Sequence, residues 1–101
     1  MNFLVKGLTI VLSTFVVNAK SEPIWTDDMT DQEKCQAEAD YMVKHGAYYH
    51  VGRCIGNFEG IGCGGSHPKI NTCTPRYKMT LTGDASAKSK SGKWVRVRSW
   101  R

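Results

Sequence analysis

Hydrophobic and polar positions divide the chain into a helical part followed by a part made of short strands. Apolar residues recur at helical spacing over residues 31–45 and predict one amphipathic helix. These apolar positions are Cys35, Ala39, Met42 and Val43. Thr30 and Glu33 fit a capping box at the start of this helix, and Gly46 stands where a left-handed residue commonly ends one.

The charged residues of this helix are expected to face solvent, because they lie largely off the apolar stripe. They are Asp31, Lys34, Glu38 and Lys44. Upstream of the helix, residues 21–29 form a polar leader. We expect only its Ile24 and Trp25 to pack onto the core.

The last third of the chain has the two-residue period of β-strands. Within residues 94–100, Trp and Arg alternate with Val and Ser, which predicts a strand with two different faces. Shorter strands are expected at residues 77–81 and 85–88, with turns at Gly83-Asp84 and Ser91-Gly92. Residues 47–54 are interpreted as a strand or an extended turn. The pattern predicts an antiparallel hairpin or three-stranded meander packed on the helix.

Residues 56–65 contain five glycines and are predicted to be an irregular loop fastened by disulfides. The four cysteines allow three pairings. We expect Cys63–Cys73, which closes a loop rich in turn residues, and Cys35–Cys54, which ties the helix to the loop after it. The expected fold class is therefore α+β, with one N-terminal helix, a glycine-rich disulfide-fastened loop and a small antiparallel C-terminal β-sheet.

The N-terminal residues 1–19 have the pattern of a secretory signal peptide. Lys6 precedes an apolar run too short to remain as a membrane span, and Val17-Asn18-Ala19 ends it with a small-residue cleavage pattern. The prediction is a single small domain over residues 20–101, secreted or periplasmic, whose cysteines meet an oxidising solvent.

Charge is unevenly distributed along this predicted domain. Residues 20–59 hold four basic and eight acidic side chains, whereas residues 60–101 hold nine basic side chains and one acid, Asp84. Such asymmetry favours an anionic partner. The alternative is that the acidic and basic halves face each other within the fold.

Basic and aromatic side chains combine near the C-terminus and form the predicted binding surface. Arg side chains bind phosphate or carboxylate with two prongs, and indole rings stack on bases or sugars. We expect contacts to an anionic polymer, an envelope surface or an acidic protein from Lys90, Lys93, Trp94, Arg96, Arg98 and Trp100. The alternative is that the arginines only cover the two Trp rings.

His50 and Glu59 are a second candidate pair, chemically suited to general acid–base catalysis. Together with a basic sheet that holds phosphate, they suggest a small secreted hydrolase such as a ribonuclease. No metal or cofactor is predicted, because the spacing of His, Cys and Glu matches no metal template and the glycine-rich stretch lacks the context of a phosphate loop.

The pattern Ala39-x2-Met42-x7-His50-x8-Glu59-Gly60-Ile61 resembles the first conserved block of the CAP superfamily of cysteine-rich secretory and pathogenesis-related proteins. The resemblance covers about residues 36–62 and implies a secreted α/β fold in which His50 and Glu59 form the cleft pair. The chain lacks the second His–Glu block of that family.

Three functions follow from the sequence. The leading one is non-catalytic binding of an anionic partner through the Arg/Trp surface. The second is hydrolysis by His50 and Glu59. The third is a protein–protein or inhibitor module that presents residues 64–69 to its partner.

Overall fold

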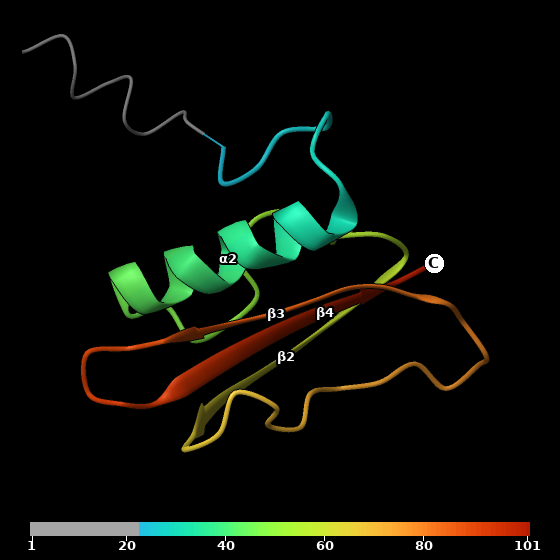
Figure 1. The fold of residues 1–101 in the computed structure, drawn as a ribbon. Coiled ribbons are helices and arrows are strands. Elements are labelled where there is room, and N and C mark those ends of the chain that lie inside the picture. Colours follow the sequence, from blue (N-terminus) through green and yellow to red (C-terminus); the bar gives the residue numbers. More distant parts are fainter. Residues whose placement is uncertain (1–22) are drawn as a thin grey trace, which may run out of the picture.

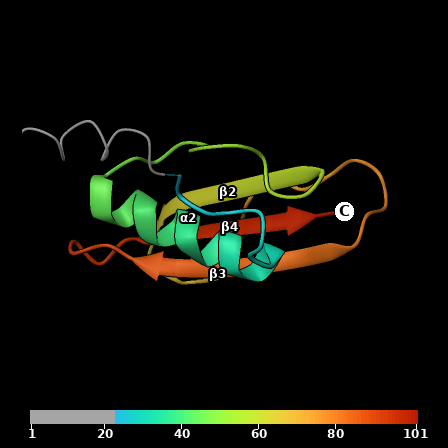
Figure 2. The same cartoon turned by 90° about the horizontal axis from the view of Figure 1, so that it is seen from above.

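One helix lies across one face of a three-stranded antiparallel sheet in the computed structural model (Figures 1 and 2). The structure describes residues 23–101, so the predicted signal peptide lies outside the described residues. The elements are α2 (Asp31–His45), β2 (Phe58–Gly65), β3 (Leu81–Lys88) and β4 (Trp94–Trp100). This arrangement confirms the α+β class. From residue 23 onward, no helix has the length and apolarity needed to cross a bilayer.

The predicted capping signals define both ends of α2. The Thr30 hydroxyl accepts a hydrogen bond from the Glu33 amide at 3.1 Å, and the Glu33 carboxylate accepts one from the Thr30 amide at 2.8 Å. Gly46 ends the helix with a φ of 64°, in the left-handed region that glycine tolerates. The helix bounds were therefore predictable from local sequence.

Strand β4 is the centre of the sheet, whose order is β2-β4-β3. Both neighbours run antiparallel to β4, and Val97 lies between Ile61 of β2 and Ala85 of β3. The turn between β3 and β4 is where Ser91-Gly92 predicted it, with Gly92 at a φ of 88°. We call residues 89–93 the hairpin turn.

The hydrophobic core lies between α2 and the sheet. Val95 and Val97 of β4 are fully buried against the helix, together with Cys35, Ala39 and Met42 of its apolar stripe. Trp25 of the leader is also buried, with Ile24 packed beside the core, as predicted.

The opposite face of the sheet is covered by residues 66–80, which we call the crossing segment. It returns beneath β2 and β4 before entering β3 (Figure 1). A Cβ at Gly60 or Gly62 would overlap the carbonyl oxygens of Cys73 and Asn71. These two glycines therefore leave the space through which the crossing segment passes.

A predicted loop and a predicted turn both lie inside strands, and both predictions were wrong because close tertiary contacts place glycine there. Residues 58–65, predicted as an irregular loop, form β2, because glycine is the residue that fits beneath the crossing segment. The turn predicted at Gly83-Asp84 lies inside β3, where Gly83 packs against the Cys35 thiol and the Ser99 hydroxyl. Residues 47–54 contain no strand, which leaves the extended turn. Of the strand expected at residues 77–81, only Leu81 lies in β3.

The disulfide-fastened loop is not present, because all four cysteines carry free thiols. Cys35 is buried beneath β4, whereas Cys54 is exposed. The carbonyl of Cys73 lies beside Gly60, three residues before Cys63 along β2. Three residues of strand span about 10 Å, beyond the Cα separation that a disulfide bridges.

The predicted solvation of Lys34 and Glu38 was also wrong. Glu38 is 0% exposed and Lys34 is 8% exposed. The leader folds back over this side of α2, so that the Trp25 indole contacts both side chains.

We expect Gly62→Ala to lower the free energy of unfolding by about 1–3 kcal/mol, because the new methyl group displaces the crossing segment from β2. Urea denaturation measures the effect. Cys63→Ala is the control, since Cys63 is exposed on the same strand and should change stability by no more than about 0.5 kcal/mol. Equal midpoints for the two variants would contradict the close approach.

Candidate functional site

The guanidinium of Arg96 is occupied within the protein. Its Nε and Nη2 donate to the two oxygens of Asp84 at 2.8 and 2.7 Å, and its Nη1 donates to the Ile70 carbonyl at 3.0 Å. The hydrogen bond from Arg96 holds the pKa of Asp84 below its usual range. Arg96 thus joins β4, β3 and the crossing segment, and its side chain is only 11% exposed.

Arg98 and Trp100 also make internal contacts on this face. Arg98 donates from Nε to the Thr72 hydroxyl at 2.9 Å and lies over the Trp100 ring, 5.0 Å from its centroid. Trp100 is buried and meets the edge of Phe58 with ring centroids 5.5 Å apart. The centre of the predicted binding strand therefore lies under the crossing segment.

The other predicted binding residues lie at the surface, at the end of the sheet that carries the hairpin turn. Lys90 and Lys93 are exposed, and Trp94 is half-buried. The Lys88 ammonium lies 5.9 Å from the centroid of the Trp94 ring. The structure thus separates the six predicted residues into an internal group and a surface group.

A cavity of about 260 Å³ opens beside the hairpin turn. It is lined by Tyr48, Cys63, Gly64, Ser91 and Lys93. α2 ends on the same side of the molecule as the hairpin turn (Figures 1 and 2). We call this end, with Lys88, Lys90, Lys93, Trp94 and the cavity, the hairpin end.

In the described chain, one ion pair joins the basic half to the acidic half, namely Arg101 with Asp31 at 2.8 Å. Arg53 and Asp27 pair within the acidic half at 2.9 Å. Within residues 23–101, the remaining exposed Lys and Arg residues have no carboxylate in salt-bridge range. They are Lys44, Lys69, Arg76, Lys78, Lys88, Lys90 and Lys93.

His50 and Glu59 are brought together, as the acid–base hypothesis requires. His50 Nδ1 lies 3.7 Å from Glu59 Oε2, with the His50 side chain 57% exposed and the Glu59 side chain 3% exposed. The other oxygen, Oε1, accepts a hydrogen bond from the Ile55 amide at 3.0 Å. The pair therefore connects solvent to the interior.

Glu38, which the sequence interpretation placed in solvent, lies behind this pair. Its Oε2 accepts a hydrogen bond from the Trp25 indole at 2.7 Å. Burial is the main cause that raises the pKa of Glu38 to about 9, and a hydrogen bond with Glu59 is the second. A signal was available, because Glu38 stands three residues after Cys35 and four before Met42, within the helical stripe.

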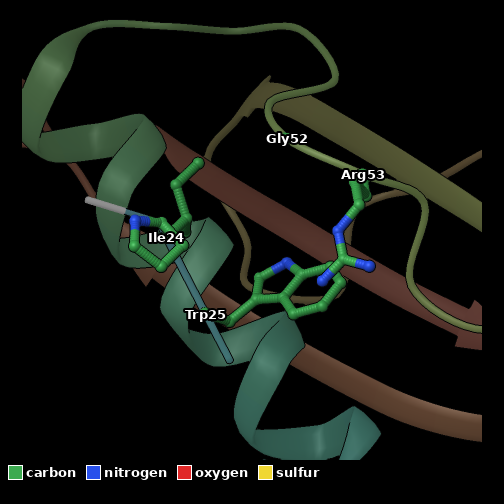
Figure 3. A pocket seen from close by; sticks show the side chains of 5 residues that line it. Ile24, Trp25, Gly52 and Arg53 are labelled. Atoms are coloured by element: carbon green, nitrogen blue, oxygen red, sulfur yellow. The ribbon is translucent and has the colours of Figure 1, made fainter. Parts of the chain in front are cut away.

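A smaller cavity of about 140 Å³ lies on the outer side of the leader. It is lined by Pro23, Ile24, Trp25, Gly52 and Arg53, and Figure 3 shows Arg53 over the Trp25 ring. The guanidinium carbon is 4.6 Å from the ring centroid. Trp25 thus contacts Arg53 through its ring and Glu38 through its indole N–H.

The thiols and imidazoles do not form a metal centre in the described part of the chain. Among residues 23–101, no three His, Cys, Asp or Glu side chains converge in a way that holds a metal ion. Burial raises the pKa of the Cys35 thiol to about 11, so this thiol is not a nucleophile near neutral pH.

Comparisons of this chain with family models, with curated proteins and with solved structures give no match. The interpretation of its function therefore depends on the geometry described above.

We expect Arg96→Ala to lower the free energy of unfolding by about 1–3 kcal/mol, because it leaves Asp84 and the Ile70 carbonyl without their donor. Arg76→Ala, at an exposed position of the crossing segment, is the matched control.

Acid should narrow the difference in the free energy of unfolding between Arg96→Ala and the unchanged protein. The lowered pKa of Asp84 means that the pair contributes fully above the ordinary Asp range and is lost as pH falls through the lowered value. Urea midpoints at pH 7 and pH 3 measure this, and a difference that grows in acid would contradict the pairing.

Proposed function

We propose that this protein is a small non-catalytic domain that acts outside the cytoplasm and binds an anionic polysaccharide at its hairpin end. The observation that carries the proposal is the group of exposed cations there that lack carboxylate partners in the described chain. The predicted signal peptide supports the location.

The distribution of charge favours the hairpin end over the centre of β4 as the binding site for an anionic ligand. The single acid of residues 60–101, Asp84, is paired with Arg96, so no acidic side chain competes for Lys88, Lys90 or Lys93 from that half of the chain. Arg96 and Arg98 have internal partners that a ligand would have to displace. The flexible lysines of the hairpin turn need no such exchange.

The chemistry of the cavity supports a sugar polymer as the ligand. Tyr48 is 45% exposed and offers an aromatic ring for stacking. Ser91 supplies a hydroxyl and Lys93 an ammonium at the same cavity. An aromatic face beside a cation and a hydroxyl suits a sugar ring that carries a carboxylate or sulfate.

We expect Lys90→Gln combined with Lys93→Gln to weaken binding of heparin or polygalacturonate roughly 10- to 30-fold at low salt, because each exposed lysine near a polyanion contributes about 1 kcal/mol. Calorimetric titration at two salt concentrations measures affinity and its salt dependence.

The control is Arg76→Gln combined with Lys78→Gln, which removes the same charge at exposed, unpaired positions of the crossing segment within the described chain. Equal losses for the two double variants would contradict a local site. Binding only to anionic vesicles, single-stranded DNA or an acidic protein would overturn the polysaccharide as ligand. Salt-insensitive affinity would overturn electrostatic binding altogether.

A second candidate function is hydrolysis, favoured by the 3.7 Å approach of His50 to Glu59. In this hypothesis the exposed imidazole exchanges protons with a substrate while the buried carboxylate orients it. The resemblance to the CAP superfamily implies the same two residues.

We expect any hydrolysis of RNA or peptidoglycan by the purified protein to fall at least 100-fold in His50→Ala, because this change removes the proton-transfer group. His67→Ala is the control, since His67 is exposed on the crossing segment. Activity that survives His50→Ala, or no activity at all, would remove this candidate.

A further inference from the structure

Two glutamate side chains from different elements meet in the interior, within hydrogen-bond reach of each other. Glu38 of α2 is 0% exposed as a whole residue, and the side chain of Glu59 of β2 is 3% exposed. Each carboxyl group has one oxygen with a donor: Trp25 for Glu38 and the Ile55 amide for Glu59. The remaining oxygens, Oε1 of Glu38 and Oε2 of Glu59, are buried and have no donor.

One proton shared by the two carboxyl groups satisfies both of these oxygens. Two ionised carboxylates in contact within the interior repel each other and leave both oxygens unsatisfied. If Glu38 is protonated, its hydroxyl donates to Glu59, and both oxygens are satisfied together. The hydrogen bond between these side chains, which favours the neutral form of Glu38, fits this state.

Of the charged side chains in the described chain, only His50 lies within salt-bridge range of the pair, with its Nδ1 3.7 Å from Glu59 Oε2. Lys34 of α2 and Arg53 of the loop contact the Trp25 ring, 4.4 and 4.6 Å from its centroid, rather than the carboxyl groups. The thiols of Cys35 and Cys54 are nearby and neutral, since burial raises the pKa of each. His50 approaches Glu59 from the solvent side.

We propose that Glu38 and Glu59 hold one proton between them, so that the two carboxyl groups beside the Trp25 indole form one hydrogen-bonded pair. Loss of this proton places two negative charges in the interior, and their repulsion drives the two side chains apart. The indole N–H of Trp25, which donates to Glu38, reports the change. The pair is thus a pH-sensitive link between side chains of α2 and β2, independent of the polysaccharide site.

The sign of the pH dependence follows from the raised pKa of Glu38. Between about 4.5, the ordinary Glu value, and about 9, the folded protein holds a proton that the unfolded chain has released. The contribution of the pair to stability is therefore fully present below about 4.5 and is lost as pH rises toward about 9.

The test follows the indole N–H resonance of Trp25 in 15N-labelled protein from pH 5 to pH 10, with Trp25→Phe used for assignment. We expect the resonance to titrate with an apparent midpoint near 9, which belongs to the pair as a whole. The melting temperature should fall over the same range.

Glu38→Gln is the decisive variant, because an amide still accepts from Trp25 and still donates to Glu59 but does not ionise. We expect it to abolish the titration and to raise the melting temperature at pH 9. Asp40→Asn, an exposed position on the same helix, should keep the titration of the unchanged protein.

Glu59→Gln provides a second readout if Glu38→Gln fails to fold. Removal of the neighbouring charge should lower the midpoint by at least one pH unit. A Trp25 resonance that does not move above pH 7, or a titration that persists in Glu38→Gln, would overturn the proposal.

Discussion

Burial of β4 on both faces is the constraint on which the rest of the structure depends. Val95 and Val97 face α2, while Arg96 and Arg98 face the crossing segment. A fully buried Val contributes about 1.5–3 kcal/mol, so one short strand supplies a substantial share of the core of a small domain. Because charged side chains occupy the second face, that face requires internal partners, and Asp84 and the crossing segment provide them.

This constraint also decides where a ligand has room. The Arg/Trp alternation suggests a binding surface, but its centre is a structural joint between β3, β4 and the crossing segment. In the described chain, the basic side chains without a carboxylate partner lie mainly at the hairpin end and along the crossing segment. The proposed site therefore lies at one end of the sheet, and the central residues of β4 do not form it.

The interior also contains a buried pair of carboxyl groups, those of Glu38 and Glu59. Burial of ionised carboxylates is unfavourable, so a protonated pair is the form that a small apolar core can hold. Side chains of three segments meet there: the leader, α2 and β2. The pair therefore links local protonation to the contact between side chains of α2 and β2. His50, which joins it to solvent, also belongs to the candidate catalytic pair.

The sequence by itself determined the features that arise from local interactions. It placed α2 between Thr30 and Gly46, the turn at Ser91-Gly92 and the alternation of β4, because caps, turns and strand periods depend on neighbouring residues. The approach of His50 to Glu59 was also consistent with their proposed pairing.

Only the tertiary structure decided which polar groups are buried and what the glycines do. Glu38 fits the helical stripe, but its burial depends on a leader that folds back over it. Gly60 and Gly62 form a strand rather than a loop, because the crossing segment occupies the space of their missing side chains. The same packing sets Cys73 beside Gly60 rather than beside Cys63. Contacts between residues distant in sequence leave no local pattern, since they depend on how the elements pack together.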